Sequence, residues 1–190
     1  MNDTRTLSVN GRTYAWPKQP LVVVCIDGSQ PEYMEEAVAS GHMPFTKEIM
    51  SRGADLRGHC VVPSFTNPNN LSIVTGVPPK VHGISGNFFL DPETGEEVMM
   101  NDPKLLRTGT IFQAFHDAGA KIAIVTAKDK LRRLLGHGLD FNSGRAMCFS
   151  SEKANETTIA EHGIDNAQAM VGRDIPDVYS AELSEFIFDA

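Results

Sequence analysis

Short apolar runs alternate along the chain with segments whose apolar residues have helical spacing. The longest run, LVVVCI at residues 21–26, is typical of a strand buried on both faces of a parallel sheet. Further strands are expected at residues 121–126 and 146–149, with another candidate at 59–63. Between them the pattern predicts helices at residues 31–40, 44–53, 67–76, 110–118, 130–135, 157–161, 165–171 and 180–190. This alternation predicts an α/β fold with a mainly parallel sheet.

Turn-forming residues mark the connections between these elements. Asn10-Gly11, between residues 6–9 and 12–16, indicates a two-residue hairpin turn. Ser29 with Glu32 fits a capping box, and Asn67 is a candidate cap for the helix at residues 67–76. Residues 77–109 predict a long irregular excursion that contains a second hairpin, around residues 91–95.

Composition and charge exclude several classes of function. The 190 residues carry a net charge of −7 and contain no basic run, so nucleic acid is not an expected partner. No apolar run is long enough to span a membrane, and residues 1–20 lack the apolar core of a secretory signal. The three cysteines are widely spaced and form no CxxC pair, which argues against a disulfide framework and against a thiolate zinc site. We therefore expect a cytoplasmic protein with no membrane partner.

Polar side chains follow the predicted strands at the edge where an open α/β sheet binds its ligands. Asp27 comes directly after the apolar run, where a carboxylate is poorly solvated and needs a cation or several hydrogen-bond donors. Lys128 and Lys130 follow the strand at residues 121–126 and could clamp a carboxylate or a phosphate. Each candidate has a simpler alternative role. Asp27 could serve merely to form a turn, and the two lysines could lie at the start of a solvated helix.

A second group of candidates lies between residues 64 and 87. Thr66 stands just before a predicted helix, where backbone N–H groups favour anions and a bound metal could turn its hydroxyl into a nucleophile. Asn87, in a glycine-rich loop, could donate to an anionic oxygen. Without further context, Thr66 and Asn67 are more simply explained as helix caps. Asn87 could hold a turn, and His82 is more simply explained as structural.

Five longer segments together carry a specific resemblance. They are LVVVCIDGSQPEY, VVPSFTNPNNLSIVTGVPPKVHGISGN, NFFLDPETGEEVMMNDP, VTAKDKLRRLLGHG and VYSAELSEF. In these segments the chain resembles the phosphonoacetate hydrolases, a family of the alkaline phosphatase superfamily close to its nucleotide pyrophosphatase/phosphodiesterase branch. The resemblance extends over essentially all 190 residues, which would form the N-terminal part of one alkaline-phosphatase-like catalytic domain.

The resemblance implies a zinc-dependent hydrolase that cleaves the carbon–phosphorus bond of phosphonoacetate to acetate and phosphate. In this family pattern Asp27 and Thr66 would bind zinc, and Thr66 would also be the nucleophile. Asn87 would bind a phosphonate oxygen, and Lys128 and Lys130 would hold the substrate carboxylate. The implied partner is a small-molecule phosphonate, and a homodimer is left open.

The chain departs from the family pattern in its metal ligands. The family also uses an Asp with a His four residues further on, an adjacent Asp-His pair and a late His, and no such motif stands in a suitable context here. We therefore expect half of a two-zinc site, with weak zinc binding and no turnover by the 190-residue chain alone. Two alternatives stay open: a phosphodiesterase or nucleotide pyrophosphatase of the same superfamily, which the two lysines disfavour, and an inactive truncated fragment.

Overall fold

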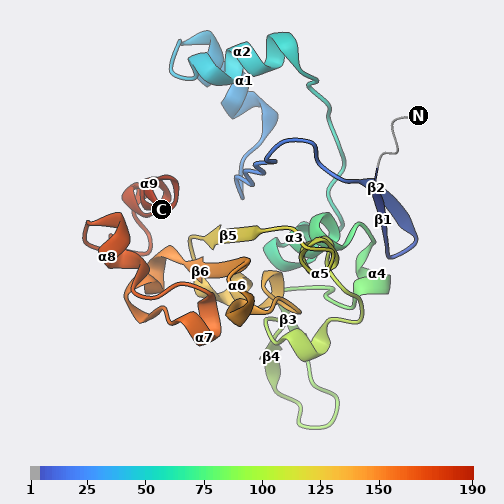
Figure 1. The fold of residues 1–190 in the computed structure, drawn as a ribbon. Coiled ribbons are helices and arrows are strands. Elements are labelled where there is room, and N and C mark those ends of the chain that lie inside the picture. Colours follow the sequence, from blue (N-terminus) through green and yellow to red (C-terminus); the bar gives the residue numbers. More distant parts are fainter. Residues whose placement is uncertain (1–4) are drawn as a thin grey trace. The chain divides into compact units, whose positions relative to one another are not determined.

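The structure, a computed structural model, describes residues 5–190 and separates into two compact units. The larger unit holds residues 5–16 and 61–190, and the smaller unit holds residues 17–60. Within the described residues, all strands and both hydrophobic cores belong to the larger unit (Figure 1). The elements that position candidate chemistry are therefore found mainly there.

A parallel pair of strands forms the centre of the larger unit. β5 (Ile122–Thr126) pairs with β6 (Ala146–Ser150) along its whole length, from Ile122 opposite Ala146 to Thr126 opposite Ser150. The crossover between them contains α6 (Asp129–Leu135), which packs against both strands. This pair confirms the α/β class and the strands expected at residues 121–126 and 146–149. Because both strands end at the same edge, the residues that follow them are neighbours.

Alternate side chains of this pair enter two different hydrophobic cores. Ile124 and Cys148 belong to a core shared with α6 and with α3 (Thr66–Thr75). Phe149 points the other way, into a second core shared with α9 (Ala181–Asp189). Successive side chains of a strand point to opposite faces, so burial on both faces requires the continuous apolar pattern that these strands show.

Short helices surround the parallel pair. In addition to those already given, the larger unit contains α4 (Pro79–His82), α5 (Ile111–Asp117), α7 (Ile159–His162) and α8 (Ala167–Val171), with 3₁₀ turns at Pro103–Leu105, Phe141–Ser143 and Ser151–Glu156. The helices predicted in this part of the chain are confirmed, with small shifts at their ends. No helix among residues 5–190 combines the length and the apolar character that a membrane crossing requires.

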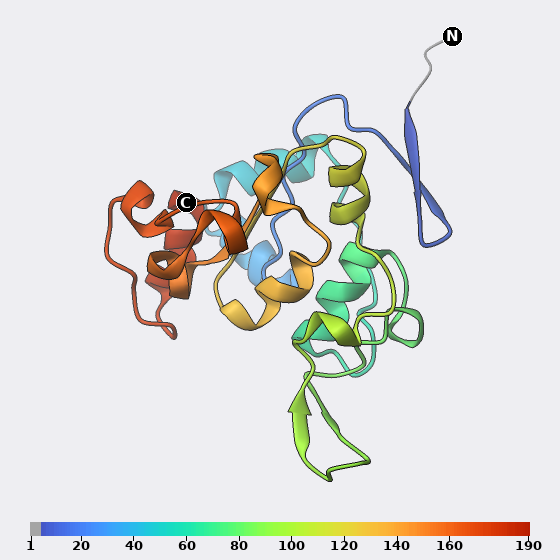
Figure 2. The same cartoon turned by 60° about the horizontal axis from the view of Figure 1, so that its bottom comes forward.

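Both predicted hairpins form. β1 (Thr6–Val9) pairs with β2 (Arg12–Ala15) through a turn in which Asn10 and Gly11 have positive φ angles of 49° and 78°, as a type I′ turn needs. β3 (Phe88–Leu90) pairs with β4 (Glu97–Met99), and this second hairpin projects from the rest of the larger unit in both views (Figure 1, Figure 2). The predicted excursion at residues 77–109 thus contains a defined hairpin in its middle.

The smaller unit consists of two helices joined to extended chain. α1 (Pro31–Ala39) and α2 (Pro44–Arg52) both begin with proline, which is favoured at the first helical position. The capping box expected from Ser29 and Glu32 is wrong, because Gln30 occupies the N-cap position without a side-chain hydrogen bond. Glu32 instead forms an ion pair with Arg57 at 3.8 Å.

The strand expected at residues 21–26 does not form within the described residues. This segment has no strand assignment, and its apolar side chains are exposed, with Val22 at 82%. The strand candidate at residues 59–63 is also wrong. A strand buried on both faces exists only where other strands pair with its edges, and the composition of a segment cannot supply those neighbours.

Gly163→Ala is expected to destabilise the larger unit strongly. Gly163 ends α7 with a φ of 73°, and an added Cβ would overlap the carbonyl oxygen of Ala146 at the start of β6. The left-handed backbone costs an alanine about 1 kcal/mol, and the overlap adds roughly 1–3 kcal/mol. Urea unfolding followed by circular dichroism should therefore show a free energy of unfolding lower by about 2–4 kcal/mol.

The matched control is Gly172→Ala. Gly172 ends α8 with a φ of 78°, but an added Cβ there meets no atom within 4 Å. This variant should lose only the backbone contribution, about 1 kcal/mol. Equal losses for the two variants would contradict the close packing of the end of α7 on β6.

Candidate functional site

Thr66 is the first residue of α3, and asparagine side chains hold the first turn of this helix. Phe65 occupies the N-cap position and makes no side-chain cap, so the capping role expected for Asn67 is wrong. The side-chain amide of Asn69 donates to the carbonyl oxygen of Phe65 at 2.9 Å. The amide of Asn70 donates to the carbonyl oxygen of Thr66 at 3.0 Å. The helix start is thus stabilised from within its own first turn.

A closed ring of hydrogen bonds joins the start of α3 to the base of the β3–β4 hairpin. The backbone N–H of Asn67 donates to Oδ1 of Asn87 at 3.1 Å, and Nδ2 of Asn67 donates to the carbonyl oxygen of Met100 at 2.9 Å. The N–H of Met100 donates in turn to the carbonyl oxygen of Asn87 at 2.8 Å. Asn67 is 1% exposed, so breaking these bonds would leave buried polar groups unpaired. The ring brings Asn87 to the helix start that also carries Thr66.

The same ring of hydrogen bonds determines which atom of the Asn87 side-chain amide can bind an anion. Because Oδ1 accepts from Asn67, Nδ2 is the half that can donate to an anionic oxygen. The helix start offers fewer backbone donors than expected, since Pro68 has no N–H and the N–H of Asn67 is bonded to Asn87. An anion bound at this place would therefore depend on side chains more than on the end of the helix.

His82 supports α3 from the side and is structural, as expected. Its ring is fully buried, Nδ1 accepts from the N–H of Ile84 at 3.2 Å, and Nε2 lies 3.1 Å from Oγ of Ser72. The Ser72 hydroxyl donates to the carbonyl oxygen of Pro68 at 2.7 Å, so Nε2 of His82 must be the donor to Ser72. Burial lowers the pKa of His82, and this effect outweighs the opposite effect of the Pro68 backbone. The lowered pKa favours the neutral ring that this hydrogen-bond geometry needs.

Lys128 and Lys130 lie beyond the carboxyl end of β5, as predicted. Lys128 is the N-cap residue of α6, and its ammonium group lies over the ring of Tyr179, 4.5 Å from the ring centre. Lys130 belongs to the first turn of α6 and is exposed. The two lysines therefore have different surroundings although they are close in sequence.

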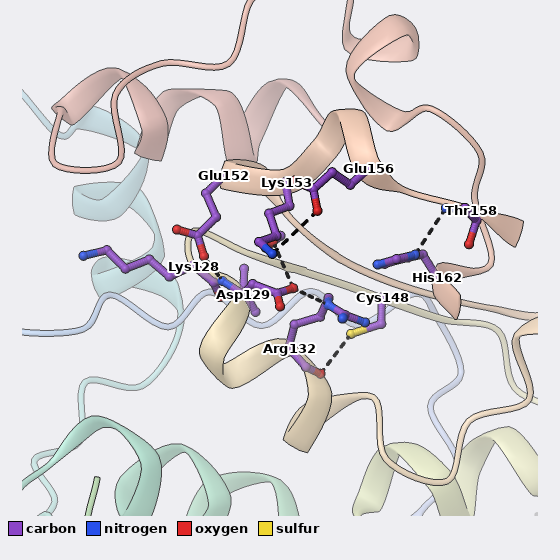
Figure 3. Close-up of polar contacts among 11 residues, drawn as sticks. Lys128, Asp129, Arg132, Cys148, Glu152, Lys153, Glu156, Thr158 and His162 are labelled. Atoms are coloured by element: carbon purple, nitrogen blue, oxygen red, sulfur yellow. Dashed lines mark hydrogen bonds and ion pairs between the residues drawn. The ribbon is translucent and has the colours of Figure 1, made fainter. Parts of the chain in front are cut away.

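A polar network links the ends of β5 and β6 beside Lys128 (Figure 3). Oδ1 of Asp129 accepts from Nε of Arg132 at 2.5 Å and from the hydroxyl of Ser150 at 3.3 Å. Glu152 accepts from the backbone N–H of Asp129 and so binds the first turn of α6. Sequence reasoning missed Asp129, Ser150 and Glu152 as parts of the site. Their one available signal was their position at or within three residues of the ends of the two buried strands.

Two further groups in this region are held by structural contacts. Sγ of Cys148 donates to the carbonyl oxygen of Arg132 at 3.4 Å, and burial raises the pKa of the Cys148 thiol to about 12, so it is not a ready nucleophile (Figure 3). Nδ1 of His162 accepts from the N–H of Thr158 at 3.2 Å. Burial lowers the pKa of His162, which again favours a neutral ring.

Asp27 belongs to the smaller unit, where it lies in a turn after residues 21–26. The N–H of Ser29 donates to the carbonyl oxygen of Ile26 at 3.4 Å and closes this turn. Asp27 itself is exposed. The two residues for which the resemblance implies zinc binding, Asp27 and Thr66, thus lie in different units.

The part of the chain that the structure describes does not by itself fit a zinc site. Among residues 5–190, no three or more His, Cys, Asp or Glu side chains come together in a group that could hold a metal ion. A catalytic zinc takes about three protein ligands. Zinc therefore stays a prediction from the resemblance.

Comparisons with known families and curated proteins find similarity to one enzyme family. Residues 21–179 match the family model of type I phosphodiesterase / nucleotide pyrophosphatase. An uncharacterized pyrophosphatase/phosphodiesterase of Schizosaccharomyces pombe is 30% identical over 117 residues, which is 59% of this chain and 22% of the relative. An ectonucleotide pyrophosphatase/phosphodiesterase of Caenorhabditis elegans is 32% identical over 83 residues, which is 42% of this chain and 10% of the relative.

Solved structures provide a closer similarity. The phosphonoacetate hydrolase of Sinorhizobium meliloti 1021, crystallised in complex with phosphonoformate, is 62% identical with a TM-score of 0.95. The match covers 98% of this chain and 45% of that chain. The same enzyme in complex with phosphonoacetate matches at 61% identity with the same TM-score and coverage. The chain thus spans less than half the length of the solved structures that it resembles.

Asn67→Asp should destabilise the larger unit by about 3 kcal/mol. The substitution keeps the shape of the side chain but replaces the Nδ2 donor with a carboxylate oxygen that faces the carbonyl of Met100 in a buried place. Urea unfolding at neutral pH measures the loss.

Asn70→Asp is the control for this change. Asn70 is half-buried and makes one comparable bond, to the carbonyl oxygen of Thr66. A negative charge near a helix N-terminus is favourable and offsets part of the lost bond, so the loss should stay below about 1 kcal/mol. Similar losses for both variants would show that the ring around Asn67 does not hold the helix start.

Proposed function

Because the chain belongs to the type I phosphodiesterase / nucleotide pyrophosphatase family, we propose that it forms part of the active site of a phosphonoacetate hydrolase. The observation that carries this proposal is the similarity of nearly the whole chain to the S. meliloti enzyme, whose structures contain phosphonoacetate and phosphonoformate. Both compounds carry a phosphonate and a carboxylate group. The proposed activity is that of the protein in which this segment acts, since the segment covers 45% of the solved enzyme.

Thr66 is the proposed nucleophile. Its hydroxyl oxygen loses its proton to solvent and attacks phosphorus, the carbon–phosphorus bond breaks, and water then hydrolyses the phosphothreonine to phosphate and free Thr66. Asn87 donates from Nδ2 to a phosphonate oxygen, because its Oδ1 is held by Asn67. The support for this assignment is that the hydrogen-bond ring places the amide of Asn87 against the start of α3, where Thr66 is the first residue.

Lys128 and Lys130 are proposed to bind the carboxylate of the substrate. When the carbon–phosphorus bond breaks, the electron pair stays on the carbon next to this carboxylate and spreads onto its oxygens. Ammonium groups beside those oxygens stabilise the charge as it develops, and therefore favour the transition state over the bound substrate. The leaving carbon then takes a proton and becomes the methyl group of acetate.

Asp27 and Thr66 are the residues that we propose as this segment's contribution to zinc binding. Residues 5–190 assemble no group of three or more such ligands, so a zinc bound by Asp27 and Thr66 would need further ligands from outside this segment. The 190-residue chain is expected to bind zinc weakly for the same reason.

A chimera tests the function. This chain replaces the matching 45% of the S. meliloti enzyme, and phosphate release from phosphonoacetate is measured with zinc present. We expect multiple turnover from the chimera and none from the 190-residue chain alone. A chimera that folds by circular dichroism but releases no phosphate would overturn the proposal.

A phosphodiesterase or nucleotide pyrophosphatase is the second candidate, because the family model and the curated relatives carry those names. The same chimera is therefore assayed with a phosphodiester, bis(p-nitrophenyl) phosphate. Faster turnover of the diester than of phosphonoacetate would favour this second candidate.

Thr66→Ala in the chimera should lower kcat for phosphonoacetate by at least about a thousandfold, because loss of a covalent nucleophile removes the chemical step. Thr66→Ser keeps a hydroxyl at the same place and should keep measurable turnover. If Thr66→Ala retains more than about a tenth of the rate, the nucleophile is a different group.

Lys128→Ala and Lys130→Ala should each lower kcat/KM for phosphonoacetate by about 10- to 100-fold, the effect of one charge-assisted contact. The loss should be far smaller for a phosphate ester without a carboxylate. Lys121→Ala, an exposed lysine just before β5, serves as the matched control. Equal losses on both kinds of substrate would indicate that the two lysines only stabilise the fold.

A further inference from the structure

The ammonium group of Lys128 is paired with an aromatic ring and not with a carboxylate. It lies 4.5 Å from the centre of the Tyr179 ring, within the range of a cation–π interaction. Among residues 5–190, Lys128 forms no ion pair within 4.0 Å. An aromatic face attracts a cation without cancelling its charge, whereas a carboxylate would neutralise it.

Two acidic residues that follow β5 and β6 are bonded to donors other than Lys128. Asp129 is bonded to Arg132 and to Ser150, and Glu152 is bonded to the N–H of Asp129. Figure 3 shows the Lys128 side chain pointing away from the Asp129–Arg132 pair. These acids therefore hold the start of α6, and among residues 5–190 neither forms an ion pair with Lys128.

Tyr179 lies in a turn just before the N-cap residue of α9. The N–H of Tyr179 donates to Oδ1 of Asp177 at 2.9 Å, and the N–H of Ser180 donates to the carbonyl oxygen of Asp177 at 3.0 Å. α9 is anchored by Leu183 and Phe186, which are 2% and 0% exposed. Tyr179 itself is 86% exposed, so its position is not explained by packing in either core.

We propose that Tyr179 is a positioning residue that holds the Lys128 ammonium group at the edge of β5 with its charge available to a substrate carboxylate. This inference rests on the proposed function for the identity of the anion. Lys130, exposed on the first turn of α6, has no such ring among residues 5–190, so Lys128 is the better prepared of the two lysines. A side chain held in its binding position before the ligand arrives loses less conformational freedom when the ligand binds.

Nuclear magnetic resonance of the 190-residue chain tests the contact without any substrate. A proton above an aromatic ring shifts upfield, so the Hε protons of Lys128 should be shifted relative to those of the other lysines, with Lys128→Met used for assignment. Tyr179→Leu should abolish the shift, and Tyr179→Phe should retain it. A wild-type Lys128 without the shift would overturn the inference. Tyr33→Leu, at another exposed tyrosine, is the control.

The chimera tests the consequence for binding. Tyr179→Leu should raise KM for phosphonoacetate by about two- to fivefold, the size of an exposed cation–π contact, and Tyr179→Phe should recover most of this loss. In a Lys128→Met background Tyr179→Leu should have no further effect, because the two residues act as one unit. A loss that persists in that background would overturn the positioning role. A folded chimera without phosphonoacetate turnover would instead overturn the proposed function, and the shift in the 190-residue chain would still decide the contact.

Discussion

Burial of the β5–β6 pair on both faces is the constraint on which the larger unit depends. Cys148 and Phe149 are successive residues of β6, both fully buried, yet they enter separate cores. Each face must be covered, so α3 and α6 pack against one face and α9 against the other. Because the two strands are parallel and in register, their polar successors gather at one edge. The place of Lys128 is thus a consequence of how the core is built.

Patterns that act over a few residues were enough to predict much of the fold. The hairpin at Asn10-Gly11, the strands at residues 121–126 and 146–149 and the helix at residues 44–53 all follow from local spacing and turn chemistry. Residues 21–26 show where this fails. Their six apolar residues fit a buried strand as well as β5 does, but strand formation also depends on pairing partners distant in sequence. The same dependence on distant pairing partners explains why the strand expected at residues 59–63 is wrong.

For the candidate site, too, local patterns could be read from the sequence, whereas contacts between distant segments could not. Position after a strand made Lys128 and Lys130 candidates, and position in a glycine-rich loop made Asn87 one. Asn67 was misassigned as a cap because its partners, Asn87 and Met100, lie 20 and 33 residues further along the chain. Tyr179 could not be connected to Lys128 for the same reason, since docking of α9 on the second core brings them together. Contacts between distant segments decide such roles, and a single sequence does not reveal them.

The local distribution of charge explains how an acidic chain could attract a doubly anionic substrate. The net charge of −7 would repel such a molecule, so the attraction must come from groups whose charge is not cancelled nearby. Asp129 is bonded to Arg132 and Ser150, Glu152 accepts from a backbone N–H, and among residues 5–190 neither acid forms an ion pair with Lys128. The amide of Asn87 is similarly committed on its oxygen side, which leaves the donor side for an anion. In both places, hydrogen bonds within the fold occupy acceptor atoms. The groups that the chain can then offer to an anionic ligand are the Nδ2 donor of Asn87 and the ammonium group of Lys128.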